Sequence, residues 1–135
     1  DASAVAAAHA GWRGLAAGVL AHSVEALRAA ATPGVALQAW LGPAIGPNRF
    51  EVGDEVRAAF CDTDAGAAAA FIANARGRWQ ADLYALARRA LAAAGVTRVS
   101  GGGWCTFTQD AQCFSYRRAA RTGRMASLVW ITPAT

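Results

Sequence analysis

The N-terminal third of the chain alternates between apolar runs and glycine or proline breakers in an order that fits one supersecondary pattern. Residues 3–8 form a short apolar run, which predicts a buried strand. Residues 14–31 place apolar side chains near one face of a helix, and Thr32-Pro33-Gly34 ends that pattern. Residues 35–41 predict a second strand. Strand, helix and strand in this order indicate a helix packed on a sheet, as in a βαβ unit.

The rest of the chain continues the alternation of helical and extended patterns, without a linker or an internal repeat. A length of 135 residues allows one domain, so we expect residues 1–135 to form a single domain. Its fold class is α/β, with a mixed sheet and packed helices. The further elements expected are helices over 54–60, 65–73 and 79–94, strands over 96–100 and 125–131, and irregular structure between 101 and 124.

Composition excludes two classes of protein. Hydrophobic residue types make up 55% of the chain and charged types 16%, which excludes disorder driven by high charge and low hydrophobicity. No apolar stretch reaches the length of about eighteen residues that a membrane span needs, so we expect no membrane partner. The net charge is +4, but the 13 basic residues are all arginines and are scattered. This scatter favours a few anion contacts over a nucleic-acid surface.

The cysteines and the N-terminus indicate the compartment. Cys61, Cys105 and Cys113 are an odd number without a small secreted scaffold, so we expect reduced thiols. No signal peptide is present, and the cytoplasm is the expected location. The chain begins with Asp1 rather than Met, so we expect further sequence upstream.

His9 is the first candidate for chemistry. It follows the first expected strand and precedes the first expected helix, where α/β folds bind ligands and helix amides can bind an anion. Arg13 beside it can hold phosphate or carboxylate through two parallel hydrogen bonds. The alternative is a structural histidine, with Arg13 paired to Glu51 or Asp54.

Two further segments can carry polar chemistry. The Gly-Pro loop over 42–49 is stiff, and it fits either an ordered connection or a pocket wall beside Glu51. Cys105 follows three glycines, but a nucleophilic thiol needs a base and a lowered pKa, so we expect Cys105 to be a buried structural residue. The second segment, residues 114–124, carries a cluster that can recognise phosphate, stack on a base or form a solvated hairpin: Tyr116, Arg117, Arg118, Arg121 and Arg124.

Five motifs occur in an order that resembles the laccase-domain family, the YfiH-like proteins also called multicopper polyphenol oxidases. The resemblance implies an α/β fold of the cysteine-hydrolase-like group. It also implies purine nucleoside or methylthioadenosine phosphorolysis, adenosine deamination, peptidoglycan-precursor editing or copper-dependent phenol oxidation. The motifs are His9-Ala10-Gly11-Trp12-Arg13-Gly14, Leu41-Gly42-Pro43-Ala44-Ile45-Gly46-Pro47, Phe50-Glu51-Val52-Gly53, Cys105-Thr106, and Phe114-Ser115-Tyr116-Arg117-Arg118 with Thr122-Gly123-Arg124-Met125.

The family site resembles a zinc-binding set of His, Cys and His, and His9 matches its last histidine. The other two ligands belong to family segments upstream of it, which this chain lacks. None of the three cysteines here matches the missing ligand by motif or order. The resemblance therefore implies that the chain is the C-terminal portion of a longer protein, with zinc as the metal and copper as the alternative.

The leading hypothesis is a metal-dependent purine nucleoside phosphorylase, or an adenosine deaminase of the same family, with a purine nucleoside as substrate and phosphate as co-substrate. His9 would be the catalytic metal ligand. The residues inferred to contact substrate or phosphate are Arg13, Glu51, Arg117, Arg118 and Arg124.

Three alternatives stay open. A copper oxidase would need more ligands than two histidines and Met125 as the only thioether. A cell-wall precursor hydrolase could use a cysteine thiolate. A non-enzymatic fragment could pair with itself as a homodimer, through surface that the missing part would cover.

Overall fold

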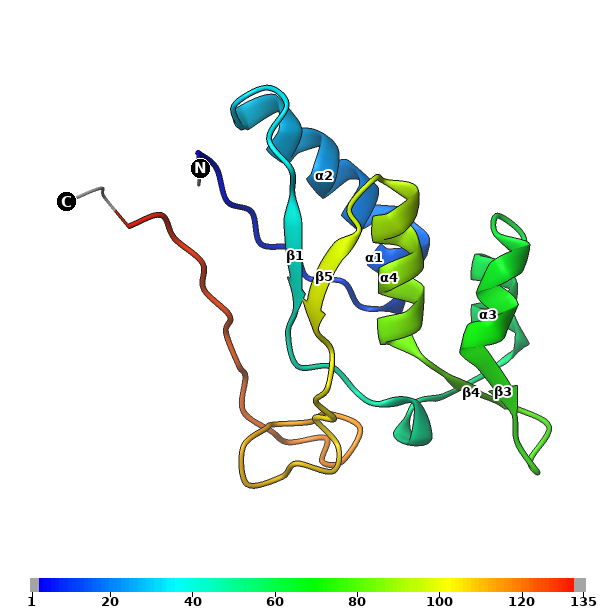
Figure 1. Cartoon of the computed structure of the whole chain (residues 1–135). Coiled ribbons are helices and arrows are strands. Elements are labelled where there is room, and N and C mark those ends of the chain that lie inside the picture. The colour runs from blue at the N-terminus through cyan, green and yellow to red at the C-terminus, as the bar shows by residue number, and fades with distance from the viewer. Residues whose placement is uncertain (1–2, 133–135) are drawn as a thin grey trace.

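The computed structural model describes residues 3–132, and its centre is a pair of parallel strands (Figure 1). Strand β1 (Gln38–Leu41) pairs with β5 (Arg98–Gly101). The parallel pair confirms the expected α/β class, because the chain returns to the same end of the sheet through helical structure. Helices α2 (Val19–Ala30) and α4 (Leu83–Ala93) contact each other beside this pair.

One face of the parallel pair is buried under these helices. Val24 of α2 and Leu91 of α4 are buried together, and Ala39 of β1 packs against them. Trp40 is the next residue of β1, and 61% of it is exposed. Side chains alternate between the two faces of a strand, so the face opposite the helices is open in this chain.

A second sheet holds three short antiparallel strands in the order β2–β4–β3: β2 (Glu51–Val52), β4 (Trp79–Ala81) and β3 (Phe71–Ala73). Helix α3 (Asp54–Cys61) packs against it. The main core lies between this sheet, α3 and α4, and burial of its apolar area is the main stabilising contribution. Its largest buried side chains are Leu15, Phe50, Val52, Val56, Phe60, Phe71, Leu83 and Leu86.

The expected helix over 14–31 is two helices. Helix α1 (Trp12–Ala16) ends before Gly18, whose φ of +82° lies in the left-handed region, and α2 begins at Val19. A residue with a side chain adopts that conformation only at a cost, so the glycine lets the chain break and restart there. The apolar spacing continues across the break, and the sequence pattern therefore did not reveal it.

The expected helices over 65–73 and 79–94 each contain a strand. Residues 65–70 form the 3-10 helix η2 (Ala65–Ala70), and the next three residues are β3. Residues 79–81 are β4, and α4 begins only after Asp82, whose carboxylate accepts a hydrogen bond from the Ala85 amide. This N-cap fixes the helix start one residue later. The expected elements at 35–41, 54–60 and 96–100 are confirmed as β1, α3 and β5, with small shifts at their ends.

The expected strands over 3–8 and 125–131 are wrong. Both runs are irregular in the structure, and 80% of Leu128 and 73% of Trp130 are exposed. An apolar run becomes a strand only when a neighbour takes up its main-chain hydrogen bonds, and neither run pairs with a strand within residues 3–132. In the same range no helix is long and apolar enough to cross a membrane.

Candidate functional site

His9 lies exposed in the segment that leads into α1. A Cβ on Gly11 would stand 3.4 Å from the His9 Nε2, so the glycine leaves room for the imidazole ring. A hollow of about 260 Å³ is lined by residues of this turn: His9, Gly11, Trp12, Arg13 and Gly14. Helix α1 has only five residues, so its dipole favours an anion at the N-terminus less than the long helix expected over 14–31 would.

Arg13 stacks on its neighbour instead of pairing with an acid. Its Cζ lies 4.5 Å from the centroid of the Trp12 ring, which is a cation–π geometry. The alternative pairing of Arg13 with Glu51 or Asp54 is wrong. Glu51 pairs with Arg76, and Asp54 accepts a hydrogen bond of 2.7 Å from the indole nitrogen of Trp79.

The described residues do not form a metal site by themselves. Within residues 3–132, no group of three His, Cys, Asp or Glu side chains comes close enough together to hold a metal ion. A structural zinc needs four protein ligands and a catalytic zinc needs three. His9 can therefore supply at most one ligand of a site completed by donors from elsewhere.

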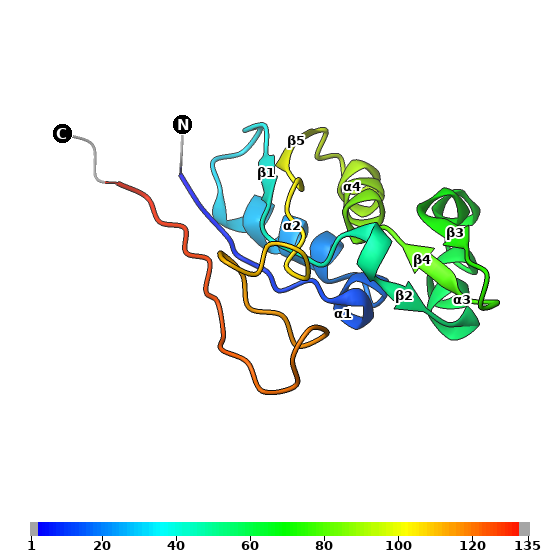
Figure 2. The ribbon, with the colours of Figure 1, turned by 90° about the horizontal axis from the view of Figure 1, so that it is seen from below.

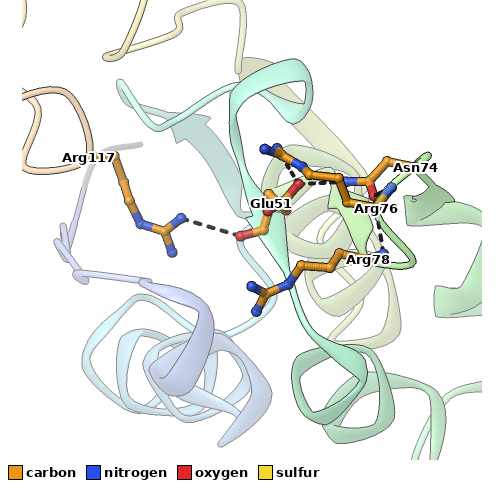
Figure 3. A network of polar contacts seen from close by, with 5 residues as sticks. All are labelled: Glu51, Asn74, Arg76, Arg78 and Arg117. Atoms are coloured by element: carbon orange, nitrogen blue, oxygen red, sulfur yellow. Dashed lines mark hydrogen bonds and ion pairs between the residues drawn. The ribbon is translucent and has the colours of Figure 1, made fainter.

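Glu51 is at the centre of the polar network in Figure 3. Its carboxylate accepts a hydrogen bond of 2.7 Å from the Asn74 side chain, and it pairs with Arg76 at 2.5 Å. The pKa of Glu51 lies below its usual value. Burial by itself would raise this pKa, but hydrogen bonds from Arg76 and Asn74 and the positive charges of Arg76 and Arg78 outweigh that effect. Glu51 is thus a paired carboxylate and not a proton donor.

Arg117 approaches Glu51 from the other side. Its guanidinium donates to the main-chain oxygen of Glu51 at 3.3 Å and lies 5.2 Å from the centroid of the Phe50 ring. The structure thereby brings Arg117 and Glu51 together, as two of the residues singled out from the sequence (Figure 3).

Arg118 and Arg124 differ from Arg117. The Arg118 guanidinium donates to three main-chain oxygens, those of Thr106, Phe107 and Cys113. It therefore fixes the fold of the irregular segment between them, which has no sheet to take up its carbonyl groups. Arg124 is exposed on the extended C-terminal segment.

Sequence reasoning missed Asn74, Arg76 and Arg78. They belong to the turn between β3 and β4, where the Asn74 amide donates to the Arg78 oxygen at 2.8 Å. The signal for this hairpin is the Asn-Ala-Arg-Gly-Arg segment with Gly77, whose φ is +68°. The apolar spacing over 79–94 predicts a helix and hides the second strand of this hairpin, β4.

The loops that follow β1 and β5 meet at the carboxyl ends of these two parallel strands. Figure 2 views this edge from below, with the segment before α1 and β2 beside it. The Tyr84 hydroxyl joins the two loops. It accepts from the Ala44 amide at 2.8 Å, and its proton can go to the oxygen of Gly42 at 3.1 Å or of Trp104 at 2.9 Å. Burial raises the pKa of Tyr84, which keeps the hydroxyl protonated.

Cys105 lines a hollow of about 220 Å³ between these loops, together with Tyr84 and Trp104. It is half-buried rather than fully buried as expected. The pKa of the Cys105 thiol lies below its usual value. Burial by itself would raise this pKa, but hydrogen bonds from the Thr108 side chain and from the amides of Gly46, Thr108 and Phe107 outweigh that effect.

Alkylation of Cys105 by iodoacetamide is expected to reach half its maximal rate at a pH below that of an ordinary thiol, because thiolate is the reactive form. Mass spectrometry of the Cys105 peptide measures the rate against pH. Thr108→Val should move the midpoint upward, whereas the exposed control Thr97→Val should leave it in place. A midpoint at or above that of an unperturbed thiol would contradict the expectation.

The parallel strand pair and the helices on one of its faces define an α/β protein, in which Tyr84 joins the loops that follow β1 and β5. The chain belongs to the family described as multi-copper polyphenol oxidoreductase laccase, whose model matches residues 1–132. This confirms the family expected from the five motifs.

Relatives of known name share the sequence over almost the whole chain. A Pseudomonas aeruginosa protein named purine nucleoside phosphorylase is 60% identical over 94% of this chain, and this region is 52% of that protein. The Escherichia coli protein named purine nucleoside phosphorylase YfiH is 56% identical over 94% of this chain and 51% of its own length. The chain thus spans about half the length of the curated relatives it matches.

Solved structures share the fold. A Neisseria meningitidis protein superposes with a TM-score of 0.73 at 45% identity, over 82% of this chain and 45% of that one. YlmD from Geobacillus stearothermophilus gives a TM-score of 0.71 at 32% identity, over 82% of this chain and 43% of its own. These matches confirm the expected mixed α/β fold.

Proposed function

We propose that this chain is the C-terminal portion of a protein that cleaves purine nucleosides with phosphate. The names of the relatives at 53–60% identity support this proposal. The geometric observation behind it is the exposed His9 in a hollow beside Arg13. In this reaction an oxygen of phosphate forms a bond to C1′ of the ribose. The bond between C1′ and the purine nitrogen breaks, and the purine keeps the bonding electrons and takes up a proton.

His9 is the proposed metal ligand of this chain. Imidazole suits zinc, which is the proposed metal, and also copper, which is the alternative. The remaining ligands would come from the rest of the protein, since residues 3–132 contain no complete donor set. A zinc ion with an open position would supply a Lewis acid.

The other proposed site residues divide by their contacts. Arg13 and Arg117 keep guanidinium donors free for phosphate or for the ribose hydroxyls. Arg118 acts by holding the loop beside them, and Glu51 holds Arg76 in place. Arg124 stays a proposed phosphate contact on the exposed C-terminal segment.

The test compares this chain with a longer version that carries the additional half present in the relatives. We expect release of hypoxanthine from inosine only when phosphate is present, and only by the longer protein. The buffer would contain zinc, and ribose 1-phosphate would be measured beside hypoxanthine. Phosphate-independent release, or equal activity of the 135-residue chain, would contradict the proposal.

We also propose a cytoplasmic location and self-association of the isolated chain. The three cysteines are free thiols, which fits a reducing compartment. Met125, Leu128 and Trp130 expose apolar surface that the rest of the protein would cover, and such surface favours dimers when uncovered. Analytical ultracentrifugation of the 135-residue chain and of the longer protein measures whether each one self-associates.

A further inference from the structure

Three arginines surround Glu51, and only Arg76 pairs with its carboxylate. The two ion pairs within residues 3–132 are Arg76 with Glu51 and Arg89 with Asp64. Arg78 and Arg117 therefore keep their charges uncompensated by an ion pair in the described chain. The Glu51 carboxylate already pairs with Arg76 and accepts a hydrogen bond from Asn74, and it forms no ion pair with Arg78 or Arg117.

Both arginines without an ion pair lie close to Glu51, and each is held in place by a hydrogen bond. The Arg117 guanidinium donates to the Glu51 main-chain oxygen and lies over the Phe50 ring. The positive charge of Arg78 is close enough to the Glu51 carboxylate to help lower its pKa. The Arg78 amide donates to the Asn74 side chain at 3.1 Å, which holds this end of the hairpin against Glu51.

The close-up of this region shows how the two guanidinium groups lie. In Figure 3 the Arg117 guanidinium reaches the main-chain oxygen of Glu51 from one side, and the Arg78 side chain extends from the hairpin on the other side past Glu51 toward it. Arg78 and Arg117 are both exposed, so an anion can reach them from solvent. Each guanidinium has five N–H donors in a planar fork, and one donor of Arg117 goes to the Glu51 oxygen. The rest can meet oxygens of a tetrahedral anion.

We propose that Arg78 and Arg117 together bind the phosphate co-substrate at the open side of β2, with Glu51 and Arg76 as the neutral pair that fixes the spacing. The proposal rests on the proposed function for the choice of phosphate, and it adds Arg78 to the residues considered from the sequence. Two guanidinium forks on one phosphate give charge-assisted, paired hydrogen bonds, which one arginine or a lysine does not reproduce.

The test measures binding of inorganic phosphate to the longer protein by calorimetry, separately from turnover. We expect Arg78→Gln and Arg117→Gln each to weaken phosphate binding about tenfold or more, as loss of a charged hydrogen-bond partner does. Arg78→Lys should recover part of the affinity, because the charge returns without the fork. Arg28→Gln on the exposed side of α2 is the matched control and should bind as the parent does.

Kinetics separate this subsite from a general loss of fold. Arg78→Gln should raise the KM for phosphate about tenfold and leave the KM for inosine unchanged. Inosine cleavage with unaltered phosphate affinity in both glutamine variants would overturn the subsite while the proposed function stands. If both variants weaken phosphate binding but the parent protein cleaves no inosine, the subsite would be supported and the proposed function would be overturned.

Discussion

His9→Ala in the longer protein is expected to lower phosphate-dependent cleavage of inosine by more than about 100-fold, since even the residues that only support metal ligands cost roughly 10–100-fold when replaced. The same variant should lose the proposed zinc, because the proposed set of three protein ligands would become two. Initial rates of hypoxanthine release and the zinc content by atomic emission measure the two effects. His9 is exposed, so the fold should survive the replacement.

The matched control is His22→Ala. His22 is the second histidine of the chain, and it is exposed on α2. It should keep the rate and the metal of the parent protein. An unchanged zinc content in His9→Ala together with full turnover would remove His9 from the site.

Phe71→Ala is expected to destabilise the chain by about 3–5 kcal/mol, the usual cost of truncating a buried aromatic side chain. Phe71 begins β3 with 6% of its surface exposed, and its ring centroid lies 6.1 Å from that of Phe60 on α3. Its strand partner Ala81 is fully buried, so the small side chain there cannot fill the cavity. The loss would weaken the packing of the antiparallel sheet on α3.

The neighbouring residue of the same strand supplies the control. Ile72 points to the other face of β3, and 70% of it is exposed, so Ile72→Ala should change stability by only a few tenths of a kcal/mol. Denaturant unfolding followed by tryptophan fluorescence compares the two variants with the parent. Equal losses at positions 71 and 72 would show that the core does not lie on the Phe71 face.

The apolar spacing in the sequence predicted the fold class and the helices that face the core. Val24 and Leu91 lie on the spaced faces of α2 and α4 and are buried as such spacing requires. The runs over 3–8 and 125–131 have strand composition but no strand partner in the described chain, and composition alone does not supply one. The break at Gly18 was invisible, because one glycine inside a helical pattern can either stay helical or end the helix.

The candidate site was only partly predictable. The position of His9 and Arg13 before a helix follows from neighbours in the sequence, and the structure places them around one hollow. The contact between Glu51 and Arg76 of the hairpin joins residues 25 apart, which no local pattern shows. Arg117 and Arg118 are adjacent and identical in type, yet one contacts Glu51 and the other holds three loop carbonyls. The fold of residues 106–118 makes that difference.

The position of the Tyr84 hydroxyl between the two loops has a dynamic consequence. The hydroxyl belongs to helix α4 and accepts from the Ala44 amide, and its one proton can go either to Gly42 or to Trp104. Because the orientation of this one hydroxyl serves both loops, a fluctuation that moves one loop should weaken the contact with the other, and we expect the two loops to open together. Hydrogen exchange at the Ala44 amide would then report the opening of both, and the hollow beside Cys105 would admit or exclude a molecule as a unit.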